Sequence, residues 1–405
     1  MAGIFCDTIC NLLALTSFGI TSLIQSFCHT HFDFGQSVGK ASPESVKLPK
    51  QSVAINSVME DKVNRVKGLF LAGLLAGVPL AAQTQPKEPA KAPMKLVLSI
   101  SLPDLKDGDF DHFAVDLEGN RLFATAEENA KVEVFDTKAN KLIHTIDGLK
   151  APHSLLFRGD LKKLFVVDSD LAEVRIYDTT SYQPAGTIKV REGADSSGYD
   201  PSTKYLYVVT GGKDAKLPQA YLEIIDTTEA KKVGEIKMDS DDVEAMAFDP
   251  SSSRMFIDIR GNSTVEVLDR DKRSVIATWP VPGAKGLTTI SFDSANHRLY
   301  VGARQPAKLY VLDSDSGKVV TSVAAPAMVD DACFSAAQKR IYFAGSEFTD
   351  VFEIKDADHV ERIGHVPTAF RAKTAILVPE LNRFYVAVPH HGTKTAAIRV
   401  YETVL

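Results

Sequence analysis

The sequence predicts an all-β fold, a seven-bladed β-propeller with four-stranded blades, on three observations. An aromatic anchor recurs within apolar segments at steps of 42 to 49 residues. The seven anchors are Phe123, Phe165, Tyr207, Phe256, Tyr300, Tyr342 and Tyr385. Each of the first six repeats contains four short strand-like segments, which is typical of one propeller blade. The last repeat lacks a fourth segment, whereas a spare one, KLVLSIS at 95–101, precedes the first repeat.

The four expected strands follow in the same order within each repeat. The first strand ends seven residues before the anchor, and the second strand contains the anchor. The third ends thirteen residues after it in five repeats, and a fourth follows, as in KLIHTI at 141–146. One four-stranded sheet cannot bury both of its faces alone, so neighbouring sheets in a ring supply the core. A pair of β-sandwiches, the alternative fold, would not produce this regular interval.

We expect the segment at 95–101 to complete the seventh blade and close the ring. Closure of this kind leaves only short sheet edges exposed to water. It also ties the start of the propeller to its end.

The residues before the repeats differ in composition. Residues 59–83 carry basic residues, then an apolar stretch and then small residues, which is the order of a secretory signal peptide. The apolar stretch, of about 13 residues, is too short to span a bilayer comfortably. We therefore expect 1–58 to be an upstream extension without structure, 59–83 a signal peptide, 84–94 a linker and 95–405 the propeller. The predicted location is periplasmic or secreted, without stable membrane insertion after cleavage.

Composition narrows the classes of partner. The formal net charge is −6 and no dense run of Lys and Arg occurs, which argues against nucleic acid as a partner. Of the four cysteines, only Cys333 lies in the predicted propeller, so an internal disulfide cannot form there. We expect a monomer that binds a protein or a small molecule.

Two segments resemble a known family. LYVVTGG at 206–212 and LYVGAR at 299–304 are each followed by a strand ending in Asp-Thr or Asp-Ser. Over about 95–405 the chain resembles the YVTN-repeat β-propellers. The resemblance implies an exported or surface propeller, mostly without established chemistry. The same type of blade is similar to the haem d1 propeller of nitrite reductases and to bacterial lactonases, so fold alone does not settle function.

One face of the disc is the candidate site. The first strand of each blade lines the central channel, and the loops before it share a face with the loops joining second to third strands. Two of those second-to-third loops carry insertions, at 211–220 and 389–397, and added loop length concentrates function on a rigid scaffold. Just outside the first strands, two adjacent positions per repeat are strongly polar. The candidate binding residues are Asp111, His112, His153, Asp195, Glu244, Asp330, Asp331, Lys373, His390 and His391.

The sequence favours a non-enzymatic module that binds a small ligand or a protein on this face. The alternative is a lactonase-like hydrolase in which a Ca²⁺ ion activates water. Its metal ligands would be Asp111, Asp195, Glu244 and Asp330. A haem-linked propeller is a third interpretation, with His153 aimed into the channel. No cofactor is firmly implied, because polar residues at a propeller opening commonly meet water or cap loop amides.

Overall fold

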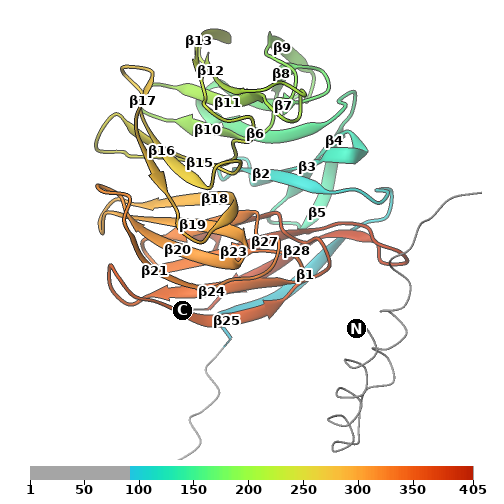
Figure 1. Cartoon of the computed structure of the whole chain (residues 1–405). Coiled ribbons are helices and arrows are strands. Elements are labelled where there is room, and N and C mark those ends of the chain that lie inside the picture. The colour runs from blue at the N-terminus through green and yellow to red at the C-terminus, as the bar shows by residue number, and fades with distance from the viewer. Residues whose placement is uncertain (1–91, 405) are drawn as a thin grey trace, which may run out of the picture. The chain divides into compact units, whose positions relative to one another are not determined.

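The computed structural model describes residues 92–404 and has seven four-stranded antiparallel sheets arranged as blades around a central axis (Figure 1). The fold is therefore all-β, and the predicted seven-bladed β-propeller is confirmed. Residues 1–58, the signal-like segment 59–83 and most of the linker 84–94 lie outside the described residues. Within the described part, no helix is long and apolar enough to cross a membrane.

The strands are numbered along the chain, and each blade takes its strands in order from the axis outward. Blade 1 contains β2 (Phe110–Asp116), β3 (Arg121–Ala126), β4 (Lys131–Asp136) and β5 (Lys141–Ile146). Blade 2 contains β6 (Pro152–Arg158), β7 (Lys163–Asp168), β8 (Glu173–Asp178) and β9 (Pro184–Lys189). Blade 3 contains β10 (Ser197–Asp200), β11 (Tyr205–Gly211), β12 (Ala220–Asp226) and β13 (Lys231–Lys237). Blade 4 contains β14 (Met246–Phe248), β15 (Arg254–Ile259), β16 (Thr264–Asp269) and β17 (Ser274–Pro280).

The remaining blades follow the same plan. Blade 5 contains β18 (Lys285–Asp293), β19 (Arg298–Gln305), β20 (Ala307–Asp313) and β21 (Val319–Ala324). Blade 6 contains β22 (Asp331–Ser335), β23 (Arg340–Ala344), β24 (Phe348–Ile354) and β25 (Val360–Pro367). Blade 7 contains β26 (Ala375–Val378), β27 (Arg383–Val388), β28 (Ala396–Thr403) and, outermost, β1 (Met94–Leu102). Single 3₁₀ turns occur at η1 (Glu127–Asn129), η2 (Gly159–Leu161) and η3 (Pro379–Leu381).

Strand β1 closes the ring, as the sequence predicts. It pairs antiparallel with β28 from Met94 opposite Thr403 to Leu102 opposite Ala396, and Figure 1 shows the two strands side by side. The strand begins one residue before the expected segment. Ile100 and Leu102 are buried against blade 7 and blade 1, so this strand also contributes to the core.

The core lies between blades. The seven anchors are between 0% and 2% exposed, and each sits in an apolar cluster shared by neighbouring sheets. Between blades 4 and 5, for example, Phe256 meets Phe292 with ring centroids 5.1 Å apart in a tilted arrangement. Full burial of one such side chain contributes about 1.5–3 kcal/mol. The recurring aromatic therefore stabilises the contact between adjacent blades.

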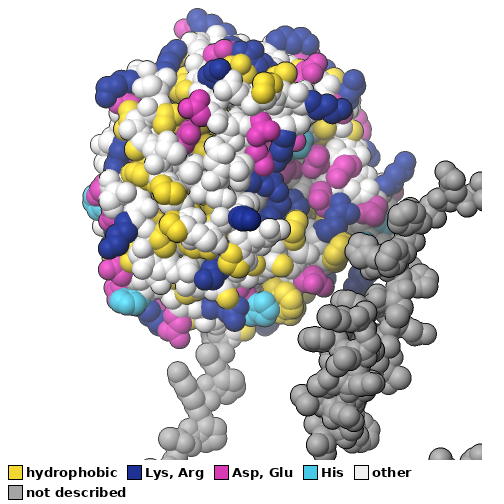
Figure 2. Space-filling model, viewed as in Figure 1, with side chains coloured by type: hydrophobic (Ala, Val, Ile, Leu, Met, Phe, Trp, Pro, Cys, Tyr) yellow, Lys and Arg dark blue, Asp and Glu magenta, His cyan; other side chains and the backbone are white. Residues whose placement is uncertain are grey.

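Polar contacts join the blades on the face opposite the candidate site. Arg270, in the turn after β16, is 9% exposed and its guanidinium pairs with Asp200 of blade 3. The same guanidinium donates to the carbonyl of Asp249 at 3.0 Å and to that of Ser253 at 3.2 Å. The face of the propeller seen in Figure 2 carries acidic and basic side chains intermixed with scattered apolar ones.

Candidate functional site

The candidate site is a cavity of 380 Å³ at one opening of the central channel, here called the mouth. Residues at the start of the inner strands and residues in the loops between second and third strands line it. Because each chain segment enters its inner strand beside the axis, the residue at that entry faces the centre. Of 21 lining residues, 13 are ionisable: Asp111, His112, Glu127, His153, Asp195, Lys213, Asp214, Glu244, Arg260, Arg304, Asp330, Asp331 and Lys373.

Eight of the ten residues expected from the sequence line the mouth. They are Asp111, His112, His153, Asp195, Glu244, Asp330, Asp331 and Lys373. His390 and His391 lie outside it. The loop that carries them forms bridges to Asp107 and Lys394, and the His391 ring lies 4.6 Å from the ring of Phe370 beside a separate cavity of 170 Å³.

Sequence reasoning missed five charged residues of the mouth, four in loops that join second to third strands and one, Arg304, at the end of the second strand β19. Glu127, Arg260 and Arg304 each stand four residues after an aromatic anchor, so a reading of that repeat position would have found them. Lys213 and Asp214 belong to the insertion at 211–220, which the sequence did mark as a functional loop.

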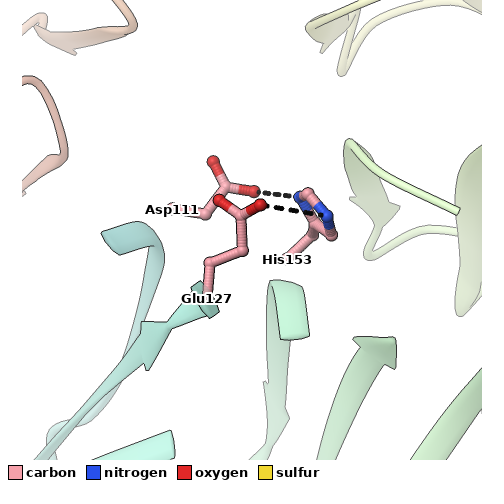
Figure 3. A group of neighbouring side chains, drawn as sticks. All are labelled: Asp111, Glu127 and His153. Atoms are coloured by element: carbon pink, nitrogen blue, oxygen red, sulfur yellow. Dashed lines mark hydrogen bonds and ion pairs between the residues drawn. The ribbon is translucent and has the colours of Figure 1, made fainter. Parts of the chain in front are cut away.

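Blades 1 to 3 contribute an acidic arc, defined as Asp111, Glu127, Asp195 and Asp214 around His153. The Nδ1 atom of His153 lies 2.8 Å from Asp111 Oδ2 and 3.1 Å from Asp195 Oδ1. Its Nε2 atom lies 3.6 Å from Glu127 Oε1. Figure 3 shows Asp111 and Glu127 both directed at the imidazole from blade 1.

The charges of the acidic arc act strongly on one another. Burial lowers the pKa of His153, but hydrogen bonds and charges from Asp111 and Asp195 outweigh it and raise that pKa to about 12. Burial likewise opposes the charge of His112, yet Asp111 raises the pKa of His112 to about 10. Burial raises the pKa of Glu127 to about 7, although His153 lowers it. The arc therefore favours positive charge at its centre.

Blades 3 to 7 contribute a basic arc, defined as Lys213, Arg260, Arg304 and Lys373 with their carboxylate partners. Arg260 lies 2.5 Å from Glu244, and Lys213 lies 3.4 Å from the same carboxylate. Arg304 and Lys373 each lie 2.5 Å from an oxygen of Asp330. Each cation of this arc is thus placed beside a carboxylate, whereas three carboxylates of the acidic arc, Asp111, Glu127 and Asp195, share one imidazole.

Besides Glu127, two more carboxyl groups of the mouth have a pKa raised to about 7. Burial raises the pKa of Glu244 to about 7, with a further rise from Asp195 and an opposing effect from Arg260. Burial also raises the pKa of Asp331 to about 7, which His112 opposes and Asp330 reinforces. Asp331 Oδ2 accepts a hydrogen bond from the backbone N–H of Ala375 at 2.7 Å, which joins blade 6 to blade 7.

The backbone around the acidic arc is fixed by the blades themselves. Thr125, which is fully buried in β3, accepts hydrogen bonds from the N–H groups of Asp111 and His112 at 3.3 Å and 2.8 Å. The N–H of Glu127 donates to the carbonyl of Asp109 at 3.0 Å. Groups carried on such supported strands are preorganised, so a ligand binds without paying for their ordering.

Comparisons with known proteins bear on the fold. No family model and no curated protein match the chain. Among solved structures, it is similar to hydrazine synthase of Kuenenia stuttgartiensis, with 15% identity, a TM-score of 0.60, and coverage of 80% of this chain and 99% of that one. It is also similar to a chain of a mitotic checkpoint complex, with 14% identity, a TM-score of 0.61, and coverage of 83% and 98%. At these identities the likeness concerns architecture alone, and together with the sheet order it identifies residues 92–404 as a seven-bladed β-propeller.

Proposed function

We propose that the chain is a non-enzymatic binding module that holds a small charged ligand in the mouth of its central channel. One observation carries the proposal: 13 of the 21 residues lining a 380 Å³ cavity are ionisable. That volume falls in the range of small-molecule sites, about 300–1,000 Å³. A polar lining of this density recognises charge and hydrogen-bonding groups and offers little to an apolar ligand.

The distribution of charge supports a cationic or zwitterionic ligand. Seven carboxyl groups face four Lys or Arg side chains and two histidines in the mouth. The excess negative charge gathers in the acidic arc, where a positive group of the ligand would bind. An anionic group of the same ligand would face Arg260 and Arg304 across the cavity.

The alternative function, hydrolysis at a Ca²⁺ ion, draws on four carboxylates around one point. Two of those four, Glu244 and Asp330, are paired with guanidinium and ammonium groups. These pairings favour the binding module over the hydrolase. Export to the periplasm or the medium remains part of the proposal and rests on the signal-like segment 59–83. Cell fractionation with sequencing of the mature N-terminus tests it, and a cytoplasmic chain would contradict it.

A ligand panel tests the proposed function. The full-length protein is screened by thermal shift and then calorimetry against diamines, basic and neutral amino acids, dicarboxylic acids and neutral sugars at low salt. Cationic or zwitterionic compounds should raise the melting temperature, and Asp195→Asn should weaken their binding. The control Asp315→Asn, an exposed residue in the turn after β20, should bind as the wild type does. Equal loss in both variants, or binding by anions alone, would contradict the proposal.

A further inference from the structure

We propose that Asp111, Glu127 and His153 form a binding site for one first-row divalent transition-metal ion, with zinc the best probe. The proposal rests on the proposed function in one respect, since the metal would occupy the acidic arc of the same mouth. It names a ligand set different from the all-carboxylate Ca²⁺ ring expected from the sequence. Glu127, which was not among the residues expected from the sequence, is essential to it.

The separation of the ligand atoms is the first support. One donor atom from each of the three residues lies within 4.8 Å of the others. His153 Nε2 and Glu127 Oε1 are 3.6 Å apart, which is longer than a hydrogen bond. Two ligands held by one tetrahedral zinc ion, with bonds of about 2.0–2.2 Å, stand about 3.4 Å apart. The pair is therefore spaced as two ligands of one ion are.

The orientation of the imidazole is the second support. A histidine that binds a metal almost always donates its other ring N–H to a carboxylate, a backbone carbonyl or water. Nδ1 of His153 lies 3.1 Å from Asp195 Oδ1 and 2.8 Å from Asp111 Oδ2, whereas Glu127 stands at the other ring nitrogen. On metal binding, Asp111 would exchange its contact with Nδ1 for the ion and leave Asp195 as the partner of Nδ1. Asp195 can therefore hold the ring with Nε2 directed at Glu127. In this arrangement Asp195 is a positioning residue and does not touch the ion.

Charge and donor type indicate the class of metal. Two carboxylates and a neutral imidazole carry a charge of −2, which a divalent ion cancels, and the imidazole releases its proton to solvent on binding. One nitrogen and two oxygen donors suit zinc and its first-row neighbours, whereas Ca²⁺ takes six to eight oxygen ligands. All three residues line the mouth, so a bound ion would keep a coordination position open to the cavity.

The experiment measures binding of ZnCl₂, MnCl₂ and CaCl₂ to the full-length protein after removal of metal with a chelator. Three cysteines lie in the first 28 residues and can bind zinc themselves. Binding at the proposed site is therefore measured as the difference in bound zinc between wild type and each variant. Wild type should bind one more Zn²⁺ than His153→Gln does, and Ca²⁺ should not compete for it. In Glu127→Gln, affinity for that ion should fall by more than about 100-fold, since loss of an outer-shell partner alone costs 10–100-fold.

The matched control is Glu244→Gln, which makes the same change on the other side of the mouth and should leave zinc affinity within about threefold. Asp195→Asn should weaken binding by about 10-fold, as expected of an outer-shell partner. Should His153→Gln fail to fold, as judged by circular dichroism, Glu127→Gln alone decides the matter. Equal zinc binding by wild type and Glu127→Gln would overturn the metal site, as would equal loss in Glu244→Gln. If zinc fails and an organic cation from the panel binds, only the metal site falls and the proposed function stands.

Discussion

Replacement of Asp331 by Asn should stabilise the protein at alkaline pH. Asp331 begins the inner strand β22, and burial raises its pKa to about 7. Between pH 3.8 and 7 the folded chain therefore binds more protons than the unfolded chain does. The free energy of unfolding then rises as the pH falls through 7 and levels off below about 4. Above pH 8, the folded protein holds an ionised carboxylate in an unfavourable environment.

The size of the effect follows from the shift in pKa. A rise from 3.8 to about 7 is about three units, and each unit is worth 1.36 kcal/mol, which sets a limit of about 4 kcal/mol. The side chain is only partly buried and lines the mouth, so solvent screens its charge and we expect about 2–4 kcal/mol. Asn keeps the hydrogen bond from the N–H of Ala375, because its amide oxygen can accept in place of Oδ2.

Urea unfolding of wild type and Asp331→Asn at pH 4 and pH 8, with chelator present, checks this prediction. At pH 8 the variant should be more stable than wild type by about 2–4 kcal/mol, and at pH 4 the two should differ by less than about 1 kcal/mol. A variant less stable than wild type at pH 8, or a difference in stability that is the same at both pH values, would contradict the raised pKa of Asp331.

Three further substitutions test the fold by chemical unfolding. Leu102→Ala, in the closing strand β1, should lower the free energy of unfolding by about 2–5 kcal/mol, because the Leu102 side chain is only 2% exposed. Leu96→Ala, in the same strand but 48% exposed, should change it by less than about 0.5 kcal/mol. Equal effects of the two substitutions would argue against closure by β1. Arg270→Met should lower the free energy of unfolding by about 3–5 kcal/mol, because it leaves Asp200 buried without its cation. Adding Asp200→Asn should recover part of that loss. A double variant no more stable than Arg270→Met alone would contradict the pairing. Gly317→Ala should lower the free energy of unfolding by about 2–4 kcal/mol, because φ is +73° there and a Cβ would stand 2.0 Å from the ring of Trp279, the single tryptophan. An unchanged denaturant midpoint would contradict that contact.

The fold could be predicted from the sequence because each blade repeats the same physical requirement. In each blade an aromatic anchor fills the space between two sheets. The anchor also stands at a constant distance from the end of the first strand, because the turn and the strand that carries the anchor keep the same length. The spare strand at 95–101 was visible for the same reason, since the last repeat otherwise lacks an outer partner. Such periodic signals do not depend on which residues meet across the axis.

The site was only partly predictable because its contacts join repeats far apart in the chain. The inner-strand position gave His153 and Asp195, but Glu127 faces them from a second-to-third-strand loop of another blade. The sequence indicated that carboxylates converge at the mouth, but it did not show that Glu244 forms an ion pair with Arg260. Which groups pair depends on how far each side chain extends in the folded ring. His391 was expected beside the others, yet its longer loop places it against Phe370.

A crystal structure of the full-length protein, saturated with the compound of the panel that binds most tightly, would show whether the mouth is the ligand site. Electron density for the compound should appear inside the cavity, with its positive group in contact with Asp195 or Glu127. Density on the opposite face of the disc, or beside His391 and Phe370, would contradict that placement.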